Sequence, residues 1–521
     1  MMHSLVHRLA IAASAGLLLA AFATLPPKNV PHVYVDNLDV TAMRSVFRKG
    51  LDEIKARAYD DQNIDDLFKS AVANFPSLDA AVTVTFANDH VTFARGDLTS
   101  DVTIAFGDPT TLTTGFIDAV LAARKISTPL KIADEEAFYK AAFAPMLAKV
   151  DLYSRYATRQ DAARNRLIRD GVIGLGLQVV SVPAGALVNA IVVGGPADRA
   201  GIKSNDVIVK VDGTRIARRS LTEMRGLLDG SNDTVVNLEI RRLQEPKPIF
   251  IEARRDLIVP DTATYTLNDG IAELHVRGFN QRTGRAVSRA ITEARVANGG
   301  SLKGIILDLR TDPGGLLDQA VEMADLFLDS GVIAVLKGRH PGAQQFYAAH
   351  RGDISDGAPI VIIVDGRTAS AAEIVAAALQ DNGRALVVGT ESLGKGSVQT
   401  VVRLPNGGEL SVTWAHVTTA RGTLLHGLGI LPDLCLAGDG ISIQGISQET
   451  IAGLLLPAET RHQWVVAGPD EAVRKDLRTA CPAQANPERA AETDLAHLLL
   501  SDRALMAQVT VGGSPQLAVK P

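Results

Sequence analysis

The chain has 521 residues, of which 46% are hydrophobic and 21% are charged, and its formal net charge is -5. This length exceeds what one hydrophobic core supports, so we expect two to four domains. No dense run of Lys or Arg occurs. Because binding to nucleic-acid phosphates needs a concentrated basic surface, the composition argues against a nucleic-acid partner.

The first 28 residues have the pattern of a segment that directs export. A basic pair, His7 and Arg8, precedes an apolar stretch over residues 9–25, and residues 21–23 read AFA, a small-x-small cleavage pattern. These features predict a secretory signal. The stretch is about 17 residues long, which is close to the lower limit for spanning a bilayer, so an uncleaved membrane anchor stays open as the alternative.

Residues 29–167 are predicted to form a mainly helical region with a small β insertion. Apolar residues recur at helical spacing over 39–57 and 135–150, whereas residues 81–93 and 102–106 alternate like strands. This region carries no pattern that points to chemistry.

Residues 168–244 consist of short β-like runs broken by Gly, Pro and Asp. Strands are expected at 177–180, 187–193, 206–211 and 235–241, with one helix at 220–228. The segments GVIGLGLQVV (171–180) and GGPADRAGIKSNDVIVKVDG (194–213) resemble those of a PDZ domain.

A Gly-rich turn precedes the first strand of this domain. Its backbone N–H groups can bind a carboxylate, and an edge strand beside it can pair with an extended peptide tail. The site predicted to bind the C-terminal tail of a substrate comprises Leu175, Gly176 and Leu177. The alternative is that these glycines only shape a turn.

Residues 245–436 alternate between apolar strands and helices, which predicts an α/β domain. Buried strands are expected at 304–309, 360–364 and 385–389, and helices at 317–328 and 370–381. The remaining region, residues 437–521, is rich in Ala and Leu and is expected to be helical, most clearly at 490–506. The fold class is therefore a multidomain α/β protein.

Cys435 and Cys481 are the two cysteines of the chain. In an oxidising compartment they could form one disulfide, but the sequence does not decide between a bonded and a free pair.

Ser370 and Lys395 are the candidate catalytic pair. Ser370 begins a helix, where free N–H groups favour a developing negative charge, so the N–H of Ala371 is predicted to help hold an oxyanion. The helix advances about 20 Å, and the strand at 385–389 returns about 16 Å. We therefore expect Lys395 to lie within reach of Ser370.

Lys395 can act as a general base only while its amine is neutral. Its neighbours are mainly Gly, Ala, Val and Leu, and burial among such residues lowers the pKa of a lysine from about 10.4. The neutral amine could then take the proton of Ser370. Gln399, four residues further on, is expected to orient that amine.

These residues resemble the carboxy-terminal processing proteases, the serine peptidases of family S41. That family has a serine at the head of an SASE-like helix, a lysine 25 positions later in a GKG loop and a glutamine four further on. Ser370, Lys395 and Gln399 match these positions. The segments LDLRTDPGGLLDQAVEMADLFL (307–328), VDLYSRYATRQ (150–160) and GLGILPDL (427–434) extend the resemblance.

The resemblance implies a Ser–Lys endopeptidase that engages the C-terminal tails of exported or unfolded proteins and needs no cofactor or metal. It also implies a location in the bacterial periplasm or cell envelope, either free or anchored in the inner membrane. An envelope adaptor protein is a further candidate partner, and the oligomeric state stays open.

The family's oxyanion hole also uses a backbone N–H of the PGG turn, here Gly314 or Gly315. Asp312 stands where the family often has Asn, and it puts a negative charge close to that hole. Ala372 replaces a second serine of many members, and His416 stands where an aromatic residue is common. None of these departures removes a catalytic group.

Three other functions fit the sequence less well. GTESLGKG (389–396) is close to a phosphate-binding loop, but Gly396 replaces the Ser or Thr that must reach Mg²⁺, and residues 397–404 read as a strand. A Ser-His-Asp hydrolase would need a GxSxG turn, which is missing. The third alternative is a non-catalytic binding protein that keeps the PDZ domain and a degenerate protease fold.

The remaining candidate groups are predicted to be structural. Ser392 and Ser397 are interpreted as loop residues. The histidines form no recognisable set with Ser370 and are interpreted as surface or structural residues: His275, His340, His350, His416 and His426. No HExxH or paired Cys/His spacing indicates a metal site.

Overall fold

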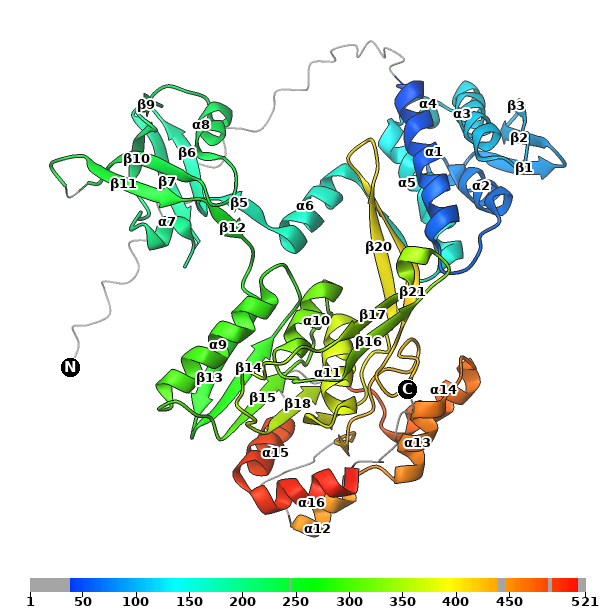
Figure 1. Ribbon diagram of the computed structural model, residues 1–521. Coiled ribbons are helices and arrows are strands. Elements are labelled where there is room, and N and C mark those ends of the chain that lie inside the picture. The colour runs from blue at the N-terminus through cyan, green and yellow to red at the C-terminus, as the bar shows by residue number, and fades with distance from the viewer. Residues whose placement is uncertain (1–37, 193, 244, 439–446, 486–489, 514–521) are drawn as a thin grey trace, which may run out of the picture. The chain divides into compact units, whose positions relative to one another are not determined.

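The computed structural model describes residues 38–521 except 193, 244, 439–446, 486–489 and 514–521. The predicted signal or anchor at residues 1–28 lies outside the described residues. Helices and sheets both contribute to the described chain, which confirms the predicted mixed class (Figure 1).

The N-terminal region is mainly helical, with one small antiparallel sheet. Its helices are α1 (Val40–Arg57), α2 (Ile64–Ala73), α3 (Pro109–Ile126), α4 (Thr128–Ile132), α5 (Glu135–Val150) and α6 (Arg159–Asp170). Its sheet is formed by β1 (Thr83–Ala87), β2 (His90–Arg95) and β3 (Leu98–Thr103). Helix α3 is an element that was not predicted, although Asp108 caps it and Pro109 begins it, a common start signal.

A second antiparallel sheet has the strand order β11-β10-β8-β7-β6. Its strands are β6 (Leu177–Val182), β7 (Gly185–Ile191), β8 (Val207–Val211), β10 (Val235–Arg241) and β11 (Ile249–Arg254), with β9 (Thr214–Arg215) beside β8. The helices are α7 (Pro196–Arg199) and α8 (Leu221–Leu228). In the described chain β6 pairs only with β7, so its outer edge is an open edge of the sheet.

A two-stranded sheet joins the chain before and after this domain. Here β5 (Val172–Gly174) pairs antiparallel with β12 (Asp256–Ile258).

The α/β domain is built on a sheet of order β13-β14-β15-β18-β19-β22. These strands are β13 (Ala263–Asn268), β14 (Ile271–Val276), β15 (Gly304–Asp308), β18 (Ile360–Val364), β19 (Ala385–Gly389) and β22 (Leu434–Cys435). All neighbouring pairs are parallel except β13 with β14. The predicted buried strands at 304–309, 360–364 and 385–389 are confirmed.

The alternation of side chains along each strand distributes them between two cores. Ile305 and Leu307 of β15 pack in the core formed with α9 (Thr283–Ala297), α10 (Leu317–Asp325) and α11 (Ala371–Asp381). Ile306 points to the opposite face, which α15 (Ala490–Ser501) and α16 (Arg503–Gly513) cover (Figure 1).

A third sheet has the order β17-β16-β21-β20 with β4 beside β21. Of its strands only β20 was predicted, from the strand pattern of residues 397–404. Its strands are β4 (Arg155–Ala157), β16 (Val332–Lys337), β17 (Gln345–Ala348), β20 (Ser397–Arg403) and β21 (Glu409–Thr418). Ser397 is therefore the first residue of a strand, which corrects its interpretation as a loop residue. Because β20 begins two residues after Lys395, this sheet fixes the far end of the lysine loop.

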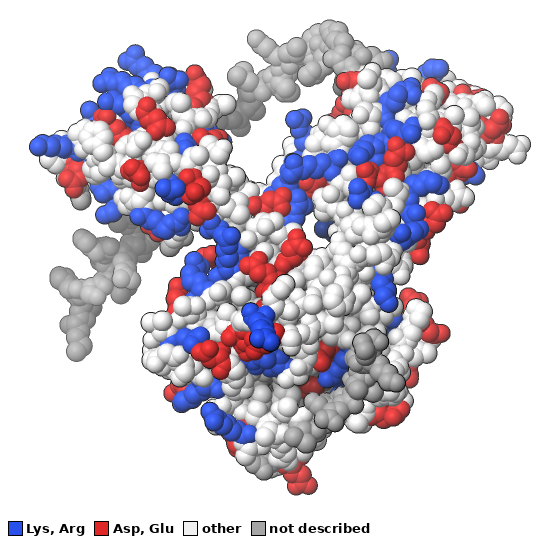
Figure 2. Space-filling view, viewed as in Figure 1, with Lys and Arg blue, Asp and Glu red and all other residues white. Residues whose placement is uncertain are grey.

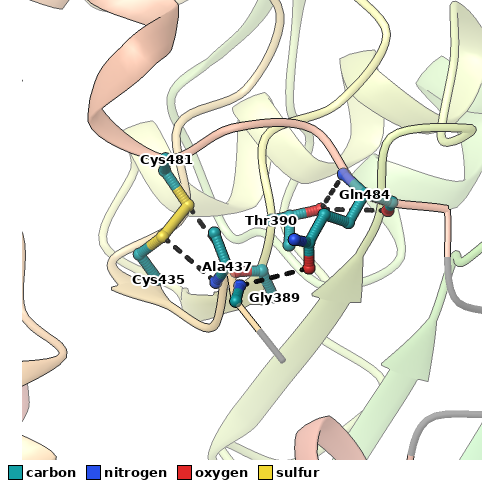
Figure 3. Close-up of a disulfide and its surroundings, with 7 residues drawn as sticks. Gly389, Thr390, Cys435, Ala437, Cys481 and Gln484 are labelled. Atoms are coloured by element: carbon teal, nitrogen blue, oxygen red, sulfur yellow. Dashed lines mark hydrogen bonds between the residues drawn. A yellow bond between two sulfur atoms is a disulfide. The ribbon is translucent and has the colours of Figure 1, made fainter. Parts of the chain in front are cut away.

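The C-terminal region is helical, as predicted. It comprises α12 (Gln448–Gly453), α13 (Ala458–Val466), α14 (Glu471–Leu477), α15 and α16. Cys435 and Cys481 form a disulfide, which answers the question that the sequence left open (Figure 3).

Acidic and basic side chains are interspersed on the face of the molecule in Figure 2. None of the helices in the described residues is both long and apolar enough to cross a membrane.

Candidate active site

Ser370 immediately precedes α11 and has a backbone conformation that serine rarely adopts. Its φ is 56° and its ψ is -115°. A non-glycine residue in such a conformation stores backbone strain, which persists only where surrounding contacts enforce it. Here the N–H of Ser370 donates to Glu373 Oε2 at 2.6 Å, and the N–H of Ala369 donates to the carbonyl of Asp312 at 2.9 Å.

The carboxylate of Glu373 joins Ser370 to the lysine loop. Glu373 is fully buried, and Oε2 accepts from the N–H of Ser370 and, at 2.9 Å, from the N–H of Lys395. Oε1 accepts from Ser392 Oγ at 2.5 Å and from the N–H of Gly394 at 2.7 Å. One oxygen thus bonds both backbones, so the expected return of the chain to Ser370 is confirmed.

Glu373 was not among the residues predicted to form the site. The pattern Ser370-x-x-Glu373 at a helix start is the signal that could have found it, because a glutamate at this spacing reaches back to the backbone of the capping residue. Burial raises the pKa of Glu373, whereas the hydrogen bonds from Ser392, Gly394, Ser370 and Lys395 lower it.

Lys395 is half-buried, and its surroundings lower the pKa of its amine. Burial lowers the pKa of Lys395, and the charge of Arg155 lowers it further, while Glu373 and Asp151 act in the opposite direction. The amine Nζ lies 5.2 Å from the centre of the Tyr153 ring. Among the described residues no hydrogen bond joins Lys395 Nζ to Ser370 Oγ.

Gln399 lies on β20, and its amide is engaged away from Lys395. Its Nε2 donates to Ser397 Oγ at 3.0 Å and to Thr413 Oγ1 at 3.1 Å. To orient the lysine amine, the Gln399 side chain would have to leave these partners.

The PGG turn packs directly against Ser370. A Cβ atom added at Gly314 would lie 2.7 Å from the Ala371 nitrogen and 2.8 Å from Ser370 Cβ, so only glycine fits there. The N–H of Gly314 donates to Asp312 Oδ1 at 2.8 Å. Within the described residues the N–H groups of Ala371 and Gly315 have no acceptor, which leaves them available to a ligand.

Asp312 is a buried acid beside these donors. Burial raises the pKa of Asp312 to about 7, although the bond from Gly314 and the charge of Arg277 oppose that shift. Its second oxygen, Oδ2, is buried without a hydrogen-bond partner in the described chain. The negative charge of Asp312, which was predicted to lie near the oxyanion hole, therefore depends on pH.

Two histidines form part of an aromatic stack beside the lysine loop. His416 and His426 stack at 4.4 Å between ring centroids, and Tyr59 stacks on His416 at 4.0 Å. Burial lowers the pKa of both histidines, that of His416 to about 4. They are packed residues that stay neutral near pH 7.

One group of residues has the spacing of metal ligands. Ligand atoms of Glu273, His275 and Asp308 lie within 4.8 Å of one another. However, Arg310 Nε donates to Asp308 Oδ1 at 2.9 Å, and Arg277 donates to Oδ2 at 3.2 Å. Because these arginines already neutralise Asp308, the group reads as an ion-pair network.

The residues expected to bind a peptide tail form the turn between β5 and β6. Gly176 has a φ of 73°, and its carbonyl accepts from the N–H of Val192 at 2.7 Å. Leu175 is buried, and its carbonyl accepts from Ala197, while Leu177 begins the edge strand β6. The turn is thus held through its carbonyls, next to the open edge of the sheet.

Comparisons with known proteins match both folded parts that the sequence indicated. The model of "Peptidase family S41" matches residues 270–436, and the model "PDZ domain" matches residues 187–242. A solved structure described as a photosystem II D1 C-terminal processing protease is 23% identical. It covers 80% of this chain and 98% of its own, with a TM-score of 0.39.

Curated relatives give the more specific similarity. The carboxy-terminal-processing protease of Bartonella bacilliformis is 36% identical over 309 residues, which are 58% of this chain and 70% of that protein. The carboxy-terminal processing protease CtpA of Bacillus subtilis is 32% identical over 304 residues, 58% of this chain and 64% of that protein. This identity, over most of the length of the Bartonella protein, shows that the chain belongs to the carboxy-terminal processing proteases, serine peptidases of family S41 that carry a PDZ domain.

Proposed function

We propose that the protein is an endopeptidase in which Ser370 is the nucleophile and Lys395 is its general base. The observation that carries this proposal is the shared bond to Glu373, whose Oε2 accepts from the backbones of Ser370 and Lys395 at 2.6 and 2.9 Å. The lowered pKa of Lys395 supports it, because a base must be neutral to accept a proton.

In the proposed reaction the Lys395 amine takes the proton of Ser370 while Oγ attacks the carbonyl carbon of the peptide bond. The N–H of Ala371 and one N–H of the PGG turn, from Gly314 or Gly315, bind the oxyanion. The lysine then gives its proton to the leaving amine, and an ester to Ser370 remains. Water activated by Lys395 hydrolyses that ester and regenerates the serine.

Gln399 has a supporting role in this proposal, which is to orient the amine once its side chain turns from Ser397 and Thr413. If Gly314 supplies the second oxyanion donor, Asp312 must release its N–H. Both changes are local side-chain movements, which substrate binding commonly induces.

The substrates proposed are exported or unfolded proteins with apolar C-termini, recognised by the turn at Leu175, Gly176 and Leu177 and by β6. The open edge of β6 supports strand addition. The export signal predicted for residues 1–28 and the Cys435–Cys481 disulfide support an oxidising location such as the periplasm or envelope. An adaptor protein and membrane association through the N-terminal segment belong to the same proposal.

The test is cleavage of an unfolded protein that ends in an apolar residue. The full chain is compared with Ser370→Ala, Lys395→Ala and, as a matched control, Lys303→Ala at an exposed position of the α/β domain. We expect the first two variants to lose at least about a thousandfold in rate, as for other nucleophile and base removals, and the control to keep full activity. Equal cleavage by all forms would overturn the proposal, and binding of tails without cleavage by any form would favour a non-catalytic binding protein.

A further inference from the structure

The loop that carries Lys395 is held on two sides. From inside, Glu373 accepts from Ser392 Oγ and from the N–H groups of Gly394 and Lys395. From the other side, the loop is contacted by residues of the C-terminal region. This second side lies outside the matched family model, which ends at residue 436.

Arg478 makes most of the contacts on that second side. Its guanidinium donates to the carbonyl of Ser392 at 3.1 Å and to that of Leu393 at 3.4 Å. It also forms an ion pair with Glu391 at 2.8 Å. A Cβ atom at Gly394 would lie 2.8 Å from the Arg478 nitrogen, so the guanidinium packs closely on the loop. Arg478 thus touches each residue from 391 to 394.

The Arg478 side chain is also held in place by contacts outside the lysine loop. This side chain is 22% exposed, and it donates at 3.0 Å to the carbonyl of Leu428, within the GLGILPDL segment. Its partner Glu391 is buried, and that burial raises the pKa of Glu391 to about 7 against the opposing charge of Arg478. Removal of the guanidinium would leave Glu391 without its counter-charge and three carbonyls without this donor.

The disulfide closes the segment onto the α/β domain three residues after Arg478. Cys481 is bonded to Cys435 at the end of the central sheet, and the carbonyl of Cys481 accepts from the N–H of Glu391 at 3.4 Å. Thr390 and Gln484 exchange two hydrogen bonds of 3.2 Å, as Figure 3 shows. The chain is therefore fixed to the start of the lysine loop on both sides of the disulfide.

We infer that residues 478–484 form a disulfide-closed clamp that positions the Lys395 amine, with Arg478 as the positioning residue. This inference rests on the proposed role of Lys395 as the base. Arg478 acts through the loop, because its contacts fix the position of residues 391–394. Glu373 in turn bonds to the loop and to the N–H groups of Lys395 and Ser370, so it links the position of the loop to both residues. A displacement of a catalytic group by about 1 Å can cost a hundredfold in rate.

The clamp also makes the site sensitive to reduction. A dithiol reductant would transfer two electrons and two protons, break the Cys435–Cys481 bond, leave two thiols and become a cyclic disulfide itself. The segment would then keep only its hydrogen bonds to the loop. Water entering beside Lys395 would raise its pKa toward the ordinary value, because burial is the main cause of the lowering.

The charged and titratable groups that face the Lys395 amine determine how a shift of its pKa is interpreted. Asp151, Tyr153 and Arg155 come from the segment before α6, and Glu373 comes from α11. None of them belongs to the clamp. A shift of the Lys395 titration in a clamp variant would therefore report a change in the position or exposure of the amine.

The experiment uses the full chain with Arg478→Gln, Arg478→Lys and, as a matched control, Arg384→Gln. Arg384 is a similarly buried arginine in an ion pair with Asp353, but it lies away from the lysine loop. Wild type is also measured before and after a dithiol reductant, so one arm needs no substitution. The readouts are hydrogen exchange of residues 391–396, acetylation of Lys395 as a function of pH, kcat and KM.

We expect Arg478→Gln and the reduced protein to exchange faster at 391–396 and to show a raised Lys395 pKa. Their kcat should fall by about a hundredfold, with KM changed less than about twofold. Arg478→Lys should restore part of the loss, and Arg384→Gln should leave the loop and the titration unchanged. Unchanged exchange and titration after both removal and reduction would overturn the inference. Hydrogen exchange and the Lys395 titration test whether the clamp positions the lysine, whatever the role of that lysine in cleavage. Normal cleavage by Lys395→Ala would overturn only the proposed function.

Discussion

At the scale of single residues, Ser370 and Glu373 form one unit. The positive φ of Ser370 is unfavourable for serine, and its N–H bond to Glu373 opposes relaxation. Four donors converge on the same carboxylate, and three of them are backbone N–H groups, which cannot bond to an amide nitrogen in its place.

Replacing Glu373 with Gln tests that unit. The amide nitrogen would face donors, so at least one buried donor would lose its acceptor at a cost of about 1–3 kcal/mol. We expect lower stability in urea unfolding and loss of most activity. Ser392→Ala is the graded comparison, because it removes a single hydroxyl and should cost less on both measures. Full activity of Glu373→Gln would show that the carboxylate does not hold the site.

Asp312 predicts a specific dependence on pH. Its pKa is raised to about 7, so the carboxyl is neutral below that pH and charged above it. The charged form opposes an oxyanion nearby and holds the N–H of Gly314. Asp312→Asn keeps the acceptor and removes the charge.

We therefore expect the ratio of kcat/KM of Asp312→Asn to that of wild type to rise through pH 7, by up to about tenfold, which corresponds to about 1.4 kcal/mol. Taking the ratio removes the common titration of Lys395 from the comparison. A ratio that stays constant between pH 5 and pH 9 would mean that the Asp312 charge does not reach the oxyanion.

At the scale of elements, the parallel strands β18 and β19 explain why a spacing of 25 residues suffices to bring Lys395 back to Ser370. Each strand is buried throughout, and α11 connects them. Local patterns predicted these elements well because strand, turn, helix and return are adjacent in sequence.

The third sheet was not predictable in the same way. It joins β4, β16, β20 and β21 from distant parts of the chain, and the pairing of Arg155 with Ser411 leaves no local signal. Glu373 had a local signal, but Arg478 did not, since it depends on the tertiary position of the C-terminal region.

The disulfide should stabilise the helices that it encloses. It links residues 46 positions apart, and a loop of that size constrains the unfolded chain by up to about 4 kcal/mol in the chain-entropy account. We expect Cys435→Ser with Cys481→Ser to lower the free energy of unfolding in urea by roughly that amount. No change in stability would show that the C-terminal region is held by its packing alone.

The edge strand β6 predicts selective binding of peptide tails. A peptide with an apolar end and a free carboxylate should bind, and the same peptide with a C-terminal amide should bind at least about tenfold more weakly, since the turn offers N–H donors to a charge. Leu177→Asp should weaken binding through repulsion. Phe250→Asp, at the 78% exposed Phe250 of β11 on the opposite edge, is the control. Equal affinity of both peptides would contradict this site.

At the scale of the whole molecule, three regions distant in sequence supply the surroundings of Lys395. The segment before α6 contributes Tyr153 and Arg155, the α/β domain contributes Ser370, and the C-terminal region contributes Arg478. Tyr59, earlier in the same N-terminal region as Tyr153 and Arg155, contacts the site as well, since it stacks on His416. Mutations far from Ser370 in sequence should therefore alter the position and the pKa of Lys395.

The central claim is that Lys395 activates Ser370, and covalent labelling tests it most directly. The full chain is treated with a serine-directed fluorophosphonate at pH 8, and the labelled peptide is identified by mass spectrometry in wild type, Lys395→Ala and Lys395→Arg. We predict a label on Ser370 in wild type and a rate at least about a hundredfold lower in both variants, because neither can accept the proton. A label on another residue, or equal labelling of Ser370 in all three forms, would contradict the claim.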